Sequence, residues 1–574
     1  MKVLSFLKPY RTSIIIALFF MLIELIVELV QPLFMAKVID DGIMVKNLLN
    51  VVKWGGLMLG ISLIAFFSGI INSFYASHTS QSFSYDVRIH LFKKIQSFSF
   101  EDINQFESAS LMTRLTNDVT QIQNTVFMSL RIMLRAPLLV VGGTILALIV
   151  NAKLGFLLAV VIPFLIVFLW RAMKKGGQLF NSVQKKLDDV NSIMRENLAG
   201  IRLIKALIRK NHELKRFAKR SEDLKKRTVS ALRLSETTRP IIMLVMNLTL
   251  LGILWFGHML VARGGIKVGD VVAIVNYATR ITTAFSPLSF IMMGLSRAKA
   301  SAQRISNVLE ATSDSADVKR PSSLPHVIEG EVTFDQVSFH YPGSNHQVIS
   351  NLSFTALPGQ TVAILGATGS GKSSLVQLIP RLYDIDSGAI FIDNIDIREL
   401  ELNDLRSQIG FVPQNVFLFT GTVKENIAWG REGASMEQII KAAKAARIHE
   451  TICGLPKQYD TVLGQKGINL SGGQKQRLSI ARALVRQPKI LILDDSTSAL
   501  DLKTERNFLQ ALKDYDCTTF IITQKISTAM EADQILLLQE GELLAKGTHD
   551  TLIKNVPLYQ QIFQSQFGRK SGTC

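Results

Sequence analysis

A glycine-rich loop in the second half of the chain has the residue types that hold nucleotide phosphates. Gly366, Gly371, Lys372 and Ser373 fit the spacing G-x-x-x-x-G-K-[ST], after an apolar run and before a predicted helix. The glycines let backbone N–H groups curl around phosphates, Lys372 neutralises the β- and γ-phosphates, and the Ser373 hydroxyl ligates Mg²⁺. We therefore expect ATP and Mg²⁺ as cofactors, in a cradle completed by Ala367, Thr368, Gly369, Ser370 and Ser374.

Two adjacent aspartates, Asp494 and Asp495, end the apolar run 490–493. A buried strand that ends in a carboxylate can hold Mg²⁺ through water, and we assign this role to Asp494. The pattern is common by itself, but 122 residues after the phosphate loop it is specific.

The composition favours a membrane protein of more than one domain. The 574 residues are too many for one core, the mean hydropathy is +0.26, and 48% of residues are hydrophobic. The net charge of +18 could serve nucleic acid or the inner face of a membrane. Residues 171–230 hold 17 Lys/Arg against 6 Asp/Glu and lie between apolar segments, without the aromatic interleaving that binds single strands. The presumed outer connection 151–153 is short. We expect a lipid bilayer and no nucleic acid as partners.

Six apolar segments are candidate membrane spans, with both termini expected on the cytoplasmic side of a bacterial cell membrane. The last is weak, because Asn276 and Arg280 make it polar enough to face a bundle interior or a cavity. Residues 1–11 show no cleavable signal and predict an amphipathic helix on the membrane surface. The six segments lie near 13–35, 54–76, 136–150, 154–170, 241–262 and 268–294.

The hydrophobic pattern divides the chain into two domains. Long helical stretches extend the spans into the cytoplasm and turn back near 98–108 and 200–213. Residues 311–325 are polar and rich in Pro and Ser, as in a linker. From 326 onward short β-rich runs alternate with helices. The expected fold is an α-helical transmembrane bundle over 1–310, followed by an α/β ATP-binding domain over 326–574.

The stretch LSGGQ at 470–474 resembles the signature of the ATP-binding-cassette (ABC) transporters. Its residues precede a predicted helix, and a helix N-terminus is an anion site. The resemblance implies that these residues grip the γ-phosphate of ATP held by a second cassette. Segments 106–119 and 195–207 resemble the intracellular loops of exporter-type members, so the turns would be coupling segments. The signature residues are Ser471, Gly472, Gly473 and Gln474.

Other positions take roles from the same resemblance. Tyr341 would stack on adenine, and Asp501 would belong to the D-loop. Gln414 would reach Mg²⁺, together with Ser373 and Asp494, and sense the transmembrane part.

The γ-phosphate site departs from the family pattern at two positions. In the family, the residue after the metal-binding aspartate is usually Glu, the base that polarises the attacking water. Asp495 at this position withdraws the carboxylate by roughly 1 Å. Gln524 stands where the family has His, and an amide carries no charge near neutral pH. Gln465, where Glu is more usual before the signature, is a softer departure.

An intact signature beside a weakened site resembles the shorter subunit of bacterial heterodimeric multidrug ABC exporters. The implied partner is a homologous half-transporter whose hydrolytic site this signature completes. A homodimer with two slow sites, a lipid or peptide exporter, and a non-transporting ATP-gated regulator remain open. The sequence does not identify the substrate, for which a hydrophobic or cationic small molecule is one class.

Glu24 and Glu28 lie one turn apart within the first apolar segment. Carboxylates inside a membrane are costly and usually face a cavity. They could contact a cationic amphipathic substrate, or they could pair structurally with Arg280 of the sixth segment.

Overall fold

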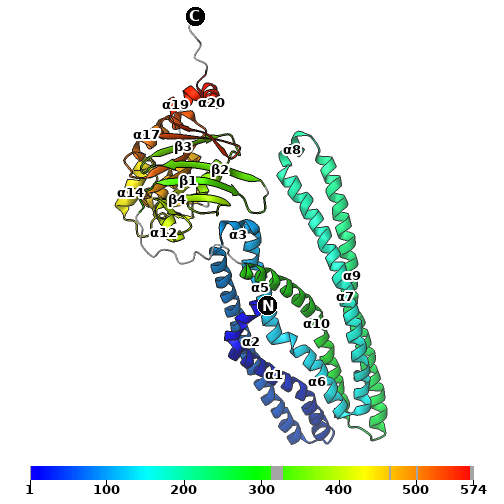
Figure 1. Ribbon diagram of the computed structural model, residues 1–574. Coiled ribbons are helices and arrows are strands. Elements are labelled where there is room, and N and C mark those ends of the chain that lie inside the picture. The colour runs from blue at the N-terminus through cyan, green and yellow to red at the C-terminus, as the bar shows by residue number, and fades with distance from the viewer. Residues whose placement is uncertain (1, 312–327, 345, 465–466, 499–501, 569–574) are drawn as a thin grey trace. The chain divides into compact units, whose positions relative to one another are not determined.

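The computed structural model describes residues 2–311, 328–344, 346–464, 467–498 and 502–568 (Figure 1). The chain forms two compact units. The first holds the described residues up to Ser97 and then Phe106–Ala311. The second holds Phe98–Gln105 together with the described residues from 328 onward. Nearly all of the predicted linker, 312–325, lies outside the described residues.

The first unit is helical throughout its described residues. Its long helices α2, α7 and α9 have 49, 48 and 53 residues. Asn47 and Asn151 start α2 and α7, because their side chains accept the free N–H groups of the first turn. The elements are η1 (Lys2–Tyr10), α1 (Arg11–Lys37), η2 (Val38–Ile43), α2 (Leu48–Gln96), α4 (Ser108–Thr113), η3 (Arg114–Asp118), α5 (Val119–Met128), η4 (Ser129–Met133), α6 (Arg135–Val150), α7 (Ala152–Ala199), α8 (Ile201–Ala206), α9 (Lys210–Ala262) and α10 (Val268–Glu310).

Five helical stretches in the described part of the chain are long and apolar enough to cross a membrane: Val3–Ile43, Leu48–Gln96, Ser108–Val150, Ala152–Ala199 and Lys210–Ala262. The third and fourth spans, short by sequence, belong to much longer helices. The sixth predicted span lies in α10, which is not among the five, and the polar Asn276 and Arg280 lie in it. At the N-terminus η1 is a 3₁₀-helix, and Tyr10 donates a hydrogen bond to Asp86 at 2.7 Å.

The described residues of the second unit form two large sheets and a two-stranded sheet of β7 and β8. A four-stranded antiparallel sheet has the order β2-β1-β4-β5, and a six-stranded sheet has the order β12-β11-β3-β10-β9-β6. The strands are β1 (Val332–His340), β2 (Gln347–Ala356), β3 (Thr361–Gly366), β4 (Ser387–Ile392), β5 (Ile395–Asp396), β6 (Ile409–Val412), β7 (Gly421–Thr422), β8 (Val462–Leu463), β9 (Ile490–Asp494), β10 (Thr518–Ile522), β11 (Gln534–Gln539) and β12 (Glu542–Gly547).

Helices flank these sheets (Figure 1). They are α3 (Phe100–Gln105), α11 (Lys372–Leu378), α12 (Leu402–Ser407), α13 (Val423–Ala428), α14 (Met436–Ala445), α15 (His449–Cys453), η5 (Gln458–Asp460), α16 (Gly472–Leu484), α17 (Leu502–Leu512), α18 (Ile526–Ala529), α19 (His549–Asn555) and α20 (Pro557–Phe567). The predicted fold class, a helical transmembrane domain followed by an α/β nucleotide-binding domain, is confirmed.

Strand register brings the chemical groups together. In the parallel part of the larger sheet, Ile522 of β10 pairs with Ile364 of β3 and with Asp494 of β9. The segments that follow these strands therefore leave the sheet at one edge, which is where open α/β sheets bind ligands. These segments carry the phosphate loop, Asp495 and Gln524.

Candidate nucleotide-binding site

The phosphate loop connects β3, which ends at Gly366, with α11, which begins at Lys372. Gly371 has φ +92°, and a Cβ there would lie 2.8 Å from the Val348 carbonyl oxygen. Only glycine meets both demands without strain. The loop thus holds the conformation in which successive N–H groups can surround a phosphate.

Lys372 folds back over the loop. Its Nζ donates to the carbonyl oxygens of Gly366 at 2.9 Å and Ala367 at 2.6 Å. Burial lowers the pKa of this ammonium, while the nearby Asp495 and Asp494 carboxylates act in the opposite direction. The cation therefore lies within the phosphate cradle.

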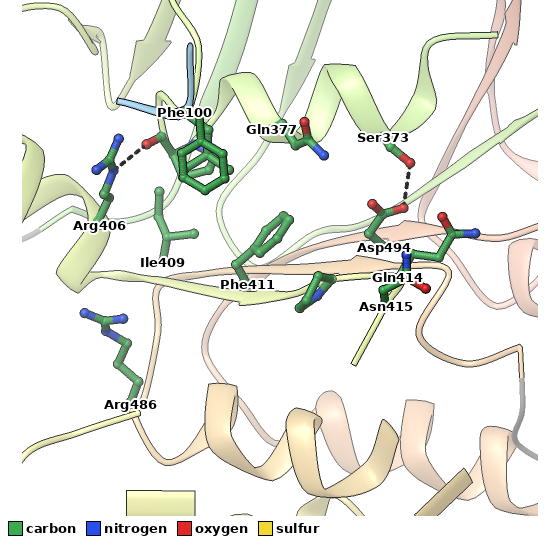
Figure 2. A pocket seen from close by; sticks show the side chains of 13 residues that line it. Phe100, Ser373, Gln377, Arg406, Ile409, Phe411, Gln414, Asn415, Arg486 and Asp494 are labelled. Carbon is green, nitrogen blue, oxygen red and sulfur yellow. Dashed lines mark hydrogen bonds between the residues drawn. The ribbon is translucent and has the colours of Figure 1, made fainter. Parts of the chain in front are cut away.

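Asp494 is 4% exposed and accepts a hydrogen bond from Ser373 Oγ at 2.9 Å (Figure 2). Burial raises the pKa of this carboxyl group, the Ser373 hydrogen bond lowers it, and the charge of Asp495 raises it. A hydroxyl and a carboxylate held together suit Mg²⁺, which takes few protein oxygens and completes its shell with water and phosphate. The residues present fit the metal.

A cavity of about 410 Å³ brings most of the predicted nucleotide residues together, whereas Gly366, Ala367 and Ser370 line another cavity, of about 630 Å³. Tyr341 borders the smaller cavity, and its hydroxyl lies 2.9 Å from Ser374 Oγ. The Tyr341 ring meets Phe339 and Tyr383 edge-on, with centroids 5.0 and 5.2 Å apart. These contacts hold the ring beside the phosphate loop. The other residues of the smaller cavity are Val348, Thr368, Gly369, Gly371, Lys372, Ser373, Gln414, Asp494, Asp495, Ile522 and Gln524.

Asp495 has φ +46°, in the left-handed region. Asp and Asn tolerate this region better than most residues because their short polar side chains can bond locally. Its Oδ2 accepts a hydrogen bond from Gln414 Nε2 at 3.4 Å. The shortened carboxylate therefore faces the cavity and contacts one of the proposed metal ligands.

The signature residues lie outside this cavity. Ser471 and Gln474 form a reciprocal cap at the start of α16: Ser471 N–H donates to Gln474 Oε1 at 2.9 Å, and Gln474 N–H donates to Ser471 Oγ at 3.4 Å. Ser471 and Gly472 are exposed. The capped N-terminus of α16 is exposed, and its residues do not line the cavity of this chain's own phosphate loop. Asp501 and Gln465 lie outside the described residues.

Comparison with known proteins decides the family. Residues 14–285 match the family model described as ABC transporter transmembrane region, and residues 349–498 match the model described as ABC transporter. The ABC transporter ATP-binding protein YfiB of Bacillus subtilis (strain 168) is 58% identical over 574 residues, covering 100% of both chains. The chain belongs to the ABC transporter family.

Two further ABC proteins describe its type. The ATP-dependent lipid A-core flippase of Acinetobacter baylyi is 32% identical over 573 residues, covering 99% of this chain and 98% of the flippase. The solved structure of a bacterial Atm1-family ABC exporter with ATP bound matches with a TM-score of 0.79 and 25% identity, over 97% of this chain and 99% of that one. This ABC protein is therefore a multi-pass membrane protein of exporter type, with an ATPase cassette that is coupled to transport.

A further cavity of the ABC cassette, of about 650 Å³, adjoins the metal residues (Figure 2). Phe100 of α3 borders it, and the ring centroids of Phe100 and Tyr383 are 6.1 Å apart. Arg406 donates to the Pro380 and Arg381 carbonyl oxygens at 3.0 and 2.7 Å. Sequence reasoning found the turn at 98–108 but missed Phe100 and Arg406. An aromatic in the turn was the only available signal.

The acidic residues of the first span are paired. Arg135 bridges both carboxylates, at 2.7 Å to Glu24 and 2.6 Å to Glu28, and Arg280 lies 3.6 Å from Glu28. Arg280 also donates to Gln31 Oε1 at 2.7 Å. The structural alternative, pairing with Arg280, is thus present for Glu28. Arg135 was missed, because it precedes the third apolar segment and nothing in the sequence places it beside the first.

Removal of Arg135 should destabilise the transmembrane unit. Arg135→Gln leaves Glu24 and Glu28 facing each other without their bridge. Breaking a buried pair typically costs about 3–5 kcal/mol, and we expect about 1–3 here because the groups are roughly a quarter exposed. A lowered unfolding temperature of the purified protein would report the loss. Arg131→Gln, at an exposed position one turn earlier, is the matched control. An unchanged unfolding temperature would contradict a structural role for the bridge.

Proposed function

We propose that this chain is one half of a heterodimeric ATP-driven exporter of amphipathic compounds. Its own site would bind ATP and turn over slowly, and its signature would complete the hydrolytic site of a homologous partner. The single observation that carries the proposal is Asp495, a carboxylate one methylene short at the position of the base. An uncharged Gln524 in the same cavity supports it.

The residues of the site have distinct proposed roles. The phosphate loop and Lys372 bind the phosphates, and Tyr341 stacks on adenine. Ser373, Gln414 and Asp494 hold Mg²⁺, which supplies neutralising charge to the phosphates when it is bound. A retained ATP would keep the cassettes closed on this side while the partner's site cycles.

The coupling segments would transmit closure to the spans. In the cassette unit, Phe100 of α3 lines the same cavity as Gln414 and Asp494, and we propose that a change at these two residues is transmitted to α3 across this cavity. We propose that ATP binding turns the spans outward and that hydrolysis on the partner's side resets them. The cassette and both termini would face the cytoplasm of a bacterial cell.

The substrate site is proposed among the polar residues of the spans. Glu24, Glu28 and Arg280 form a network with Arg135, so their charges largely balance. Such a network suits an amphipathic substrate that carries both polar and apolar parts better than a bare cation. A homodimeric lipid exporter is the second candidate, favoured by the similarity to the lipid A-core flippase.

The test compares ATPase rates of the purified chain alone and of the chain co-produced with candidate half-transporters from a neighbouring gene. We expect little turnover alone and brisk turnover in the pair, which the partner's catalytic carboxylate variant abolishes. Transport of a fluorescent amphipathic dye into vesicles distinguishes an exporter from a regulator. The heterodimer proposal is contradicted if the lone chain hydrolyses ATP briskly and Asp495→Asn stops that hydrolysis.

A further inference from the structure

The side chain of Lys525 anchors the loop that carries Gln524. Its Nζ donates to Glu505 Oε2 at 2.7 Å and to the Thr497 carbonyl oxygen at 3.3 Å. Glu505 is 3% exposed and also accepts from Thr528 Oγ1 at 2.7 Å. Thr497 belongs to the segment that leaves β9 after Asp494. The anchor therefore ties the Gln524 loop to the segment that follows β9, which begins with Asp495.

The same loop is held from the opposite direction by the last helix of the cassette, α20. Gln566 Nε2 donates to the Gln524 carbonyl oxygen at 2.6 Å, and the Ile526 N–H donates to Gln566 Oε1 at 2.8 Å. The Gln566 side-chain amide thus pairs with the backbone on both sides of Lys525, in the way that a backbone amide of a neighbouring strand would. Gln524 itself is exposed, and the Gln566 amide holds its backbone carbonyl group.

α20 is firmly seated, so it can serve as a support. Tyr559 is fully buried in a core shared with Ile526, Ala529 and Leu552, and its hydroxyl lies 2.8 Å from His549 Nδ1. Between α20 and the phosphate loop lies a cavity of about 630 Å³, bordered by Gln524 as well as by Leu558 and Ile562 of α20. Gln566 and the loop that it holds therefore connect the helix to the nucleotide site by direct hydrogen bonds.

We propose that Gln566 is a positioning residue of the nucleotide site: its amide fixes the backbone of the Gln524 loop, so that the C-terminal helix sets how tightly this chain retains ATP. The inference rests on the proposed place of Gln524 beside the γ-phosphate. A displacement of 1 Å at a reacting or binding group can change its effect about 10²-fold. Because Gln566 is exposed and water competes for its bonds, we expect a smaller change.

The first measurement is amide hydrogen exchange of the full-length chain without nucleotide. In Gln566→Ala the Ile526 amide loses its acceptor and should exchange about 3- to 10-fold faster. In Gln566→Glu the acceptor remains, so Ile526 should stay protected, while the charge opposes the Gln524 carbonyl oxygen. Gln564→Ala, at another exposed position of α20, is the matched control and should leave Ile526 unchanged. An unchanged exchange rate of the Ile526 amide in Gln566→Ala overturns the proposal that Gln566 fixes this loop.

The second measurement is the affinity for TNP-ATP with Mg²⁺, in competition with ATP, on the same proteins. We expect Gln566→Ala and Gln566→Glu to lower the affinity for ATP about 3- to 10-fold, with an unchanged unfolding temperature. In a Gln524→Ala background the Gln566→Ala effect should vanish, since the two act in series. If Ile526 exchanges faster in Gln566→Ala while only Gln524→Ala lowers the affinity for ATP, the positioning role of Gln566 is overturned. That result leaves the proposed place of Gln524 intact. If Gln524→Ala has no effect either, the proposed place of Gln524 fails, and the inference fails with it.

Discussion

Gly472→Asp should lower the ATPase rate of the assembled exporter about 10²-fold or more. In the proposed composite site, the N-terminus of α16 faces the γ-phosphate of the partner's ATP, and a carboxylate placed there would oppose that charge. Removing a single donor to a developing anion costs about 10²–10³ in rate, so repulsion should cost at least as much. The variant should fold, since a Cβ at Gly472 meets nothing within 4 Å and an acidic residue favours a helix N-terminus.

The matched control is Gly472→Asn, which has the same size and no charge. It should lose far less activity than Gly472→Asp. The contrasting variant is Lys372→Ala, which weakens this chain's own phosphate loop and should slow the pair only a few-fold if that loop merely retains ATP. The reverse ranking, with Lys372→Ala abolishing turnover and Gly472→Asp tolerated, would show that hydrolysis occurs at this chain's own site.

Local spacing was enough to predict a glycine-rich loop between a strand and a helix, and to select the residues that we propose for the metal. The segment from Gly366 to Ser374 is contiguous, and its shape follows from glycines next to a strand. The meeting of Asp494 with Ser373 was also predictable, because parallel strands that end in functional residues share one sheet edge.

Contacts between distant segments could not be predicted in this way. Arg135 bridges Glu24 and Glu28 across about a hundred residues, and Gln566 reaches Gln524 from the last helix. Both depend on how helices pack, and neither is marked by a motif. Of the two alternatives that the sequence left open for Glu24 and Glu28, the network contains the structural pairing, with Arg135 as an additional partner. Only Arg280 had been named as a partner, and it is the more distant of the two.

Asp495→Glu should raise turnover at this chain's own site about 10- to 10²-fold in the assembled pair. The longer side chain restores the reach of the base, and a missing or misplaced base typically costs about 10²–10⁴. Part of the gain is offset by the backbone, because Asp495 has φ +46° and glutamate tolerates that region less well. The gain is measured with the partner's own base removed, so that the partner's site contributes nothing.

Asp495→Asn is the isosteric control, which keeps the size and the Gln414 contact but removes the charge. It should leave the slow rate nearly unchanged if Asp495 is too short to act. Should Asp495→Glu give no gain while Asp495→Asn abolishes the rate, the aspartate would already be an adequate base. If neither variant changes the rate, Gln524 becomes the limiting group, and Asp495→Glu combined with Gln524→His should release it. The combined variant restores both a base with full reach and a group that can carry charge. If it also leaves the rate unchanged, the slow turnover has a cause outside the γ-phosphate site.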